Sequence, residues 1–373
     1  MVFRAKFKAD GSLDRYKARL VAQGFTQLPG FDYCHTFSPV VQASTIPVVL
    51  SIVVSNNWPL HQLDVQNAFL NDVLSKAIYM EQPPGFIDPQ FPNHVCRLKK
   101  AIYGLKQASL AWYQRLSDFL VHVGFFYDLK SFISRLHQEF AITDLGKLGY
   151  FFGLEVTYTS SGIFLNQAKY ARDILQRASL EESKPVSTPL VAGCQLSTDG
   201  QPFEDPTLYR SLVGLLQYLT ITRPDLSFDV NLVSQHLQHP TIAHFQAVKR
   251  ILRYVKHTPA FGLSFTCSSS FSLVAYSDAD WARCVETRRS TYGYSIFLGG
   301  NLVSWSAKKQ PTVSRSSCES EYRALANTSS EMGACFQWSA RDSIRIIRLT
   351  GCRHFNESSP SPFVCIFQRQ APR

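Results

Sequence analysis

A stretch of turn-forming residues divides the sequence and limits how the chain can fold. Residues 181–207 run from two glutamates and a Lys-Pro pair into a segment dense in Ser, Thr, Gly and Pro, a composition typical of a linker. A chain of 373 residues is long enough for about two to three domains. The linker therefore predicts a domain boundary.

Apolar periodicity on both sides of the linker predicts a mixture of helices and strands, an α+β chain. Residues 339–373 show no clean periodicity, which predicts a poorly ordered tail. The expected helices are 110–123, 132–140, 168–178, 207–220, 240–257 and 319–326, and the expected strands are 150–158, 273–278 and a hairpin over 292–305 that turns at Gly299-Gly300-Asn301.

Charge and cysteine usage narrow the function classes. The 38 Lys and Arg against 28 Asp and Glu give a net charge of +10, which favours a polyanionic partner such as nucleic acid but also fits simple solubility. Nine cysteines without a C-x-x-C pair support neither a zinc site nor a disulfide framework. The apolar run Ile46–Val54 is too short to span a membrane. We therefore expect an intracellular protein, in the cytoplasm or nucleus, without a membrane partner.

One carboxylate stands out because its surroundings are apolar. Asp64 lies in a strand-like stretch between Leu63 and Val65, where an Asp is costly unless a metal ion or a hydrogen-bond donor meets it. The alternative is an Asp at a strand end that caps the next turn. This stretch taken alone favours the cap.

Several ordered motifs surround Asp64 and continue along the chain. Together they closely resemble the reverse transcriptase of copia-type LTR retrotransposon Pol polyproteins, most densely over residues 3–128. The motifs are Tyr16–Phe25, Thr36–Val41, Tyr79–Phe86, Ile102–Ala108, Trp112-Tyr113, Asp144–Leu154, Tyr209–Gly214 and Thr222–Asp225.

The resemblance implies roles for five residues. Asp64 matches the first metal-binding carboxylate of the polymerase palm, and Phe69 matches the aromatic residue that rejects a 2′-hydroxyl. Gln107 resembles the residue that positions the incoming nucleotide, and Lys17 and Arg19 resemble basic fingers residues near its triphosphate. The implied cofactor is Mg²⁺, and the implied partner is a template–primer or an RNA–DNA hybrid.

The second polymerase carboxylate cluster is missing from its expected place. The family carries Tyr-Val-Asp-Asp on a hairpin, but here Gly124-Phe125-Phe126-Tyr127-Asp128 runs straight into the segment that forms the expected helix containing Phe140. The adjacent acidic pairs, Glu181-Glu182 and Glu204-Asp205, both lie in the linker. The single residues Asp128 and Asp144 are interpreted as turn or helix-cap residues. We therefore expect an internally deleted palm with an open strand edge, doubtful Mg²⁺ binding and no polymerisation.

A second constellation follows the linker. Tyr276–Trp281 and Ser314–Ala326 resemble the RNase H domain of the same polyproteins, which implies that Asp278 and Glu321 share a metal ion. Asp280 and Glu319 are interpreted as solvated neighbours. The family's later Cys-Asp-Asn strand and its final helix are absent, so this domain is predicted to be incomplete.

The predicted organisation is a truncated reverse transcriptase fingers and palm region (1–180), a linker (181–207), a helical connection (208–272), a partial RNase H-like domain (273–338) and an unrelated tail (339–373). Three functional readings stay open: an inactive Pol fragment, an enzyme whose missing carboxylates come from a partner chain, and a host-retained nucleic-acid-binding protein without catalysis. Basic residues among aromatics fit a template–primer groove and solvated helix faces equally well; they are Lys99, Lys100, Lys106, Arg115, Lys249, Arg250, Arg253 and Lys256.

Overall fold

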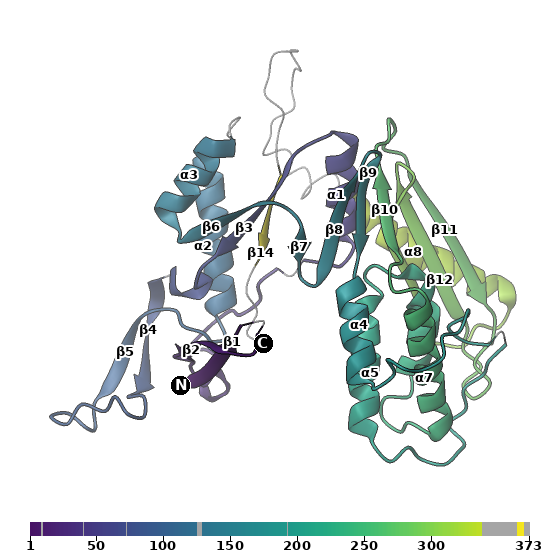
Figure 1. Ribbon diagram of the computed structural model, residues 1–373, viewed down its shortest axis with the longest axis horizontal. Coiled ribbons are helices and arrows are strands. Elements are labelled where there is room, and N and C mark those ends of the chain that lie inside the picture. Colours follow the sequence, from purple (N-terminus) through teal and green to yellow (C-terminus); the bar gives the residue numbers. More distant parts are fainter. Residues whose placement is uncertain are drawn as a thin grey trace. The chain divides into compact units, whose positions relative to one another are not determined.

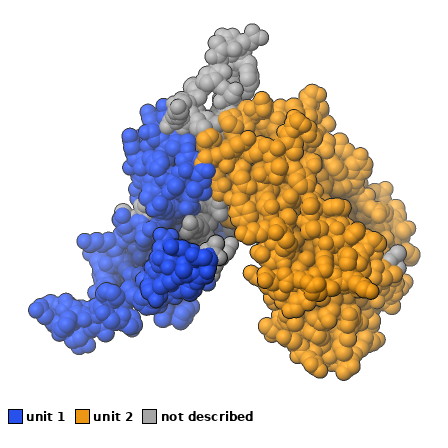
Figure 2. All heavy atoms as spheres, in the orientation of Figure 1, with its two compact units in different colours: residues 1–41, 63–145, 367–373 blue, residues 42–62, 146–366 orange. Residues whose placement is uncertain are grey.

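The computed structural model describes residues 1–8, 10–39, 41–71, 73–124, 129–191, 193–337 and 364–368 (Figure 1). The chain divides into two compact units (Figure 2). Unit 1 comprises Met1–Val41, Leu63–Leu145 and Phe367–Arg373, and unit 2 comprises Gln42–Gln62 and Gly146–Ile366. The mixture of helices and sheets agrees with the predicted α+β class.

Unit 1 combines two antiparallel ribbons with a helical pair. Trp112 and Phe119 on one helix make edge-to-face contacts with Phe140, at ring-centroid distances of 5.3 and 5.1 Å, and the Arg115–Glu139 ion pair spans 2.7 Å. These contacts join the two helices predicted from periodicity. The elements are β1 (Val2–Phe7), β2 (Leu13–Arg19), η1 (Gly24–Thr26), η2 (Ala68–Asn71), β4 (Val73–Glu81), β5 (Val95–Lys100), α2 (Ala108–Val123) and α3 (Leu129–Glu139).

Strand β3 (Leu60–Val65), which carries Asp64, lies in a three-stranded sheet of order β14–β3–β6. Its neighbours are β6 (Ile142–Lys147) and β14 (Val364–Gln368). Five residues of the segment predicted to be a disordered tail therefore form a strand, and β3 has a neighbour on each side. Both edges of β3 are therefore paired, in keeping with the tendency of free strand edges to pair, and the open palm edge stays a prediction.

A four-stranded antiparallel sheet begins the main part of unit 2, in the order β10–β9–β8–β7. The single strand predicted for 150–158 is wrong, because Phe152 and Gly153 both have positive φ, 47° and 74°, and turn the chain into a tight hairpin. Residues 262–266, predicted to belong to a helical connection, form its edge strand. The strands are β7 (Tyr150–Phe151), β8 (Leu154–Thr159), β9 (Gly162–Asn166) and β10 (Gly262–Thr266).

The apolar helix α1 (Thr45–Ser55) lies between two sheets of unit 2. Val49 and Leu50 pack into the core of the four-stranded sheet, whereas Val48 and Ile52 pack against Ile296 of a second sheet. A helix that is apolar on all sides needs such double burial. None of the described helices combines the length and apolar character required to cross a membrane.

A helical core follows the first sheet in unit 2. Asp205 caps α5 by accepting a hydrogen bond from the Leu208 amide at 2.9 Å, with Pro206 at the first helical position. Thr241 and His244 form a capping box that begins α7. The helices are α4 (Ala168–Arg177), α5 (Pro206–Leu219), η3 (Pro224–Leu226), α6 (Ser227–Ser234) and α7 (Ile242–His257).

The last sheet of unit 2 is an antiparallel meander of order β11–β12–β13. Its hairpin turns at Gly299-Gly300, as predicted, and both glycines have positive φ. The helix predicted at 319–326 is longer and packs on β11, where Thr328 Oγ1 donates to Ser277 Oγ at 3.0 Å. The elements are β11 (Leu273–Asp280), β12 (Thr291–Leu298), β13 (Asn301–Lys309) and α8 (Ser317–Gln337).

Candidate nucleic-acid interface

The β1–β2 hairpin gathers cations on one face. Its antiparallel register places Arg4 opposite Lys17 and Lys6 opposite Arg15, with Arg19 next along the same face. Directly opposed like charges destabilise a two-stranded ribbon. The opposite face carries Phe3 and Tyr16, whose side chains are exposed.

These cations repel one another. The neighbouring Arg19 guanidinium lowers the pKa of the Lys17 ammonium below its usual range, and partial burial and the other hairpin cations act in the same direction. The Asp64 carboxylate acts in the opposite direction, so Asp64 lies within electrostatic reach of Lys17. A phosphate bound on this face would relieve the repulsion.

Tyr103 contacts both Arg19 and Phe69, to which the resemblance gives separate roles. The ring of Phe69 meets that of Tyr103 edge to face at 4.9 Å, and the Arg19 guanidinium lies 5.9 Å from the Tyr103 centroid. Arg19 and Phe69 are therefore brought together through Tyr103. Tyr103 lies in the Ile102–Ala108 motif, but the sequence alone assigns it no role, because an aromatic residue in such a motif is equally typical of a core.

Gln107 lies at the end of a hydrogen-bond network within unit 1. Its Oε1 accepts from Gln27 Nε2 at 3.1 Å, and its Nε2 donates to the Asp32 carbonyl at 3.3 Å. Gln27 Oε1 in turn accepts from the Lys106 amide at 2.8 Å. Gln107 therefore holds the 27–32 loop against the start of α2, and its action on a nucleotide stays a prediction.

Two glycines allow the segment after β2 to pass close to the segment before α2. A Cβ on Gly24 would lie 2.0 Å from the Gly104 carbonyl oxygen, and a Cβ on Gly104 would lie 2.1 Å from that of Ala22. Gly104 also has a φ of 92°, which other residues rarely adopt. The Ala22 amide donates to the Tyr103 carbonyl at 2.7 Å, so this crossing fixes the segment after β2 to the segment before α2.

The interpretation of Asp144 as a turn or cap residue is wrong. It is an exposed residue of β6. The Gln66 amide donates to the Ala141 carbonyl at 2.8 Å, and Gln66 Nε2 donates to Thr143 Oγ1 at 3.0 Å. These tertiary contacts draw the segment into a strand despite its turn-like composition. Asp128, interpreted in the same way, lies outside the described residues, as does most of the predicted deletion junction.

A two-ion polymerase site needs several converging oxygen ligands. Among the residues that the structure describes, no group of three or more His, Cys, Asp or Glu side chains could hold a metal ion. Asp64 is half-buried on β3. The described donors around it therefore do not fit a two-ion site.

The two carboxylates that were expected to share a metal ion, Asp278 and Glu321, lie on adjacent elements, β11 and α8. Glu321 on α8 is exposed and lines a pocket of about 310 Å³ together with Ser277. Side chains alternate along a strand, so Asp278 lies on the other face of β11 from Ser277, where it is exposed. The metal site that Asp278 and Glu321 were expected to share stays a prediction.

The two acidic neighbours make surface ion pairs. Asp280 pairs with Arg283 at 2.7 Å, and Glu319 pairs with Arg323 at 2.6 Å. This agrees with their interpretation as solvated neighbours.

The basic residues of α7 donate hydrogen bonds to the linker, which neither the groove nor the solvated-face alternative predicts. Arg253 Nε donates to the Lys184 carbonyl at 2.6 Å, Arg250 donates to Thr188 Oγ1 at 2.9 Å, and Lys256 Nζ donates to the Ser183 carbonyl at 2.7 Å. These cations hold the linker against the helix. They are therefore weaker candidates for a nucleic-acid groove than the hairpin cations.

Comparison with known proteins decides the family. The reverse transcriptase (RNA-dependent DNA polymerase) family matches residues 1–128. The Pol polyprotein of transposon RE1 from Arabidopsis thaliana is 45% identical over 372 residues, which cover 90% of this chain. A transposon Ty5-1 protein of Saccharomyces cerevisiae is 31% identical over 308 residues, which cover 72% of this chain and 100% of that protein. The chain belongs to the copia-type retrotransposon Pol family.

Other matches extend the same picture. A mitochondrial protein of Arabidopsis thaliana is 50% identical over 204 residues, which cover 55% of this Pol chain and 85% of that protein. This Pol chain spans about a quarter of the RE1 polyprotein, 25% of its length. No solved structure matches it.

Proposed function

We propose that this copia-type Pol chain binds nucleic acid through the cationic face of the β1–β2 hairpin and does not polymerise. The observation that carries the proposal is the opposed pair Arg4 and Lys17, flanked by further cations on the same face. Such an arrangement costs stability in the free protein and suits a polyphosphate backbone. Unpaired bases could stack on the exposed aromatic residues of the opposite face.

The sequence supports the proposed lack of polymerisation. In-line displacement uses two metal ions that clamp the attacking and leaving oxygens, and one carboxylate cannot fix both. Asp64 matches the first polymerase carboxylate, but the paired carboxylates of the family have no counterpart before Phe140. We propose that this copy is an internally deleted one, with an RNase H-like region from Leu273 that has lost its later carboxylates. Its ancestral activity is RNA-directed DNA synthesis with RNase H.

Replacing the opposed pair by Arg4→Gln and Lys17→Gln should weaken binding to single-stranded nucleic acid. We expect roughly a tenfold loss at low salt, because two phosphate contacts disappear. The slope of log affinity against log salt should become shallower by about 1.4, at about 0.7 for each contact on a single strand. Filter binding of a labelled oligonucleotide across a salt series measures both quantities.

The matched control removes the same charge elsewhere. Arg172→Gln with Arg177→Gln changes two exposed cations of α4 in unit 2, and affinity and slope should stay close to those of the unaltered chain. Equal losses in both double variants would show that only net charge matters. An unaltered chain whose affinity is flat with salt would contradict the proposal.

Primer extension tests the second half of the proposal. The purified chain should incorporate no nucleotide on a template–primer with Mg²⁺ or Mn²⁺, because the described donors do not gather a two-ion site. The Asp64→Asn variant should give the same background, and an active polymerase on the same template provides the positive control. Incorporation that Asp64→Asn abolishes would overturn the inactive reading and favour carboxylates supplied by a second chain.

A further inference from the structure

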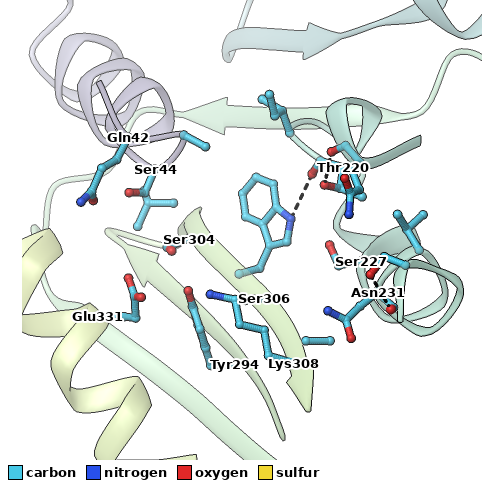
Figure 3. A pocket seen from close by; sticks show the side chains of 18 residues that line it. Gln42, Ser44, Thr220, Ser227, Asn231, Tyr294, Ser304, Ser306, Lys308 and Glu331 are labelled. Carbon is cyan, nitrogen blue, oxygen red and sulfur yellow. Dashed lines mark hydrogen bonds between the residues drawn. The ribbon is translucent and has the colours of Figure 1, made fainter. Parts of the chain in front are cut away.

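Unit 2 contains a polar pocket whose lining includes neither Asp64 nor Asp278 nor Glu321. It has a volume of about 350 Å³, and Figure 3 shows its lining from close by. Helix α6, the end of α5, strand β13 and helix α8 all contribute. Most of the lining side chains are hydroxyls or carboxamides, including Gln42, Ser44, Ser227, Asn231, Ser304 and Ser306.

The aromatic surface of this pocket is held in place. Trp305 lines the pocket and also packs against the core cluster that includes Leu50 and Phe265. Its Nε1 donates to the Thr220 carbonyl at 3.2 Å. An indole that is packed and hydrogen-bonded in this way is a rigid platform, and aromatic ligands stack on such platforms at little entropic cost.

Hydrogen-bonding groups lie on both sides of the pocket. Ser227 and Asn231 on α6 lie across it from Ser44 and Glu331 (Figure 3). Asn231 accepts from Gln235 through Oδ1 at 3.2 Å, so its Nδ2 is the end that can donate to a ligand. The combination of a stacking surface with carboxamide and hydroxyl groups matches the ring and the polar edge of a nucleobase.

A tyrosine hydroxyl adds to this set without adding charge. Burial raises the pKa of Tyr294 to about 12, so its hydroxyl stays protonated at neutral pH. The charged side chains that line the pocket are Lys308, which is exposed, and Glu331, which is half-buried. Because the two side chains have opposite charges, a ligand that carries many charges of one sign would be repelled by one of them. A ligand with a neutral ring and a single phosphate could place that phosphate at the exposed Lys308 ammonium.

We propose that this pocket binds one nucleotide, with its base stacked on Trp305 and its phosphate directed toward Lys308. The same chemistry is offered by a free nucleoside monophosphate and by an unpaired nucleotide within a strand. The proposal goes beyond the function proposed above, because every residue of the pocket belongs to unit 2 and none belongs to the β1–β2 hairpin.

The test uses calorimetric titration of the full chain with adenosine, guanosine, cytidine and uridine 5′-monophosphates. Ribose 5-phosphate, which has no base, is the matched ligand control. We expect at least one monophosphate to bind and ribose 5-phosphate to bind at least tenfold more weakly. Loss of the stacking surface in Trp305→Leu should weaken binding of that monophosphate by roughly 5- to 150-fold.

Two further variants distinguish a specific loss of binding from misfolding. Trp281→Leu removes a half-exposed tryptophan outside the pocket, whose Nε1 also donates to a backbone carbonyl, and should bind like the unaltered chain. Asn231→Leu changes a half-buried residue of α6 and should weaken binding while circular dichroism stays unchanged. The proposal is overturned if no monophosphate binds, if ribose 5-phosphate binds equally well, or if Asn231→Leu and Trp281→Leu behave alike.

A second arm identifies the source of the nucleotide. It uses the Arg4→Gln and Lys17→Gln chain, so that the hairpin contributes little, and compares the monophosphate with a single-stranded tetranucleotide. Tighter binding of the tetranucleotide, lost in Trp305→Leu, identifies a strand as the ligand, and tighter binding of the monophosphate identifies the free nucleotide. Both results could still be interpreted if the hairpin proposal failed, because this background already lacks the Arg4–Lys17 pair.

Discussion

Replacing Arg223 by methionine should lower the free energy of unfolding of unit 2 by about 3 kcal/mol. The Arg223 side chain is 2% exposed and forms a bidentate pair with Asp225, at 2.9 and 2.7 Å. It also donates to the carbonyl and hydroxyl oxygens of Thr258 at 2.8 and 2.7 Å. Methionine fills much of the space but leaves the buried oxygens of Thr258 and the partly exposed Asp225 carboxylate without their donor. Urea unfolding followed by tryptophan fluorescence measures the loss.

A second ion pair, with the same N–O distance but more exposed side chains, provides the control. Arg283 pairs with Asp280 at 2.7 Å, but these side chains are 32% and 50% exposed. Water competes for an ion pair of this kind, so Arg283→Met should cost no more than about 1 kcal/mol. Equal losses in the two variants would show that burial does not set the value of the Arg223 pair.

The elements that could be predicted from sequence are those with long, regular periodicity. Helices α2, α4, α5 and α7 lie within a few residues of their predicted ranges, and the Gly299-Gly300 turn is confirmed. The hairpin at Tyr150–Thr159 was missed because a two-residue turn usually carries Asn-Gly or Gly-Gly, and here Phe152 occupies a positive φ of 47°. The short strand β10 was missed because only its pairing with β9 makes it a strand.

The candidate interface could also be predicted only in part from the sequence. The hairpin cations alternate with other residues along the sequence, but only the register shows that Arg4 faces Lys17. The α7 cations were equally plausible as a groove, and only the structure shows that they hold the linker through Arg253 and Lys256. Periodicity identifies a face of an element, whereas the partner of that face depends on tertiary contacts between residues distant in sequence.

Replacing Gly104 by alanine should destabilise unit 1 by about 3 kcal/mol. Two costs add: alanine at a φ of 92° costs about 1–2 kcal/mol, and its methyl carbon would lie 2.1 Å from the Ala22 carbonyl oxygen. The second contact is with backbone, which cannot rotate away as a side chain could, so strain of about 1–3 kcal/mol follows. Hydrogen exchange of the Ala22 amide, which donates to Tyr103, reports the local opening.

Gly85→Ala is the matched control for this crossing. Gly85 has a φ of 82°, similar to that of Gly104, but an added methyl carbon would meet no atom within 4 Å. It should therefore show only the conformational cost, about 1–2 kcal/mol. The chain that follows β2, which carries part of the cationic face, contacts Tyr103 through Val21 and Ala22. Gly104→Ala should therefore also weaken oligonucleotide binding, and Gly85→Ala should not. If both variants lose the same stability and keep the same affinity, the crossing at Gly24 and Gly104 does not organise the interface.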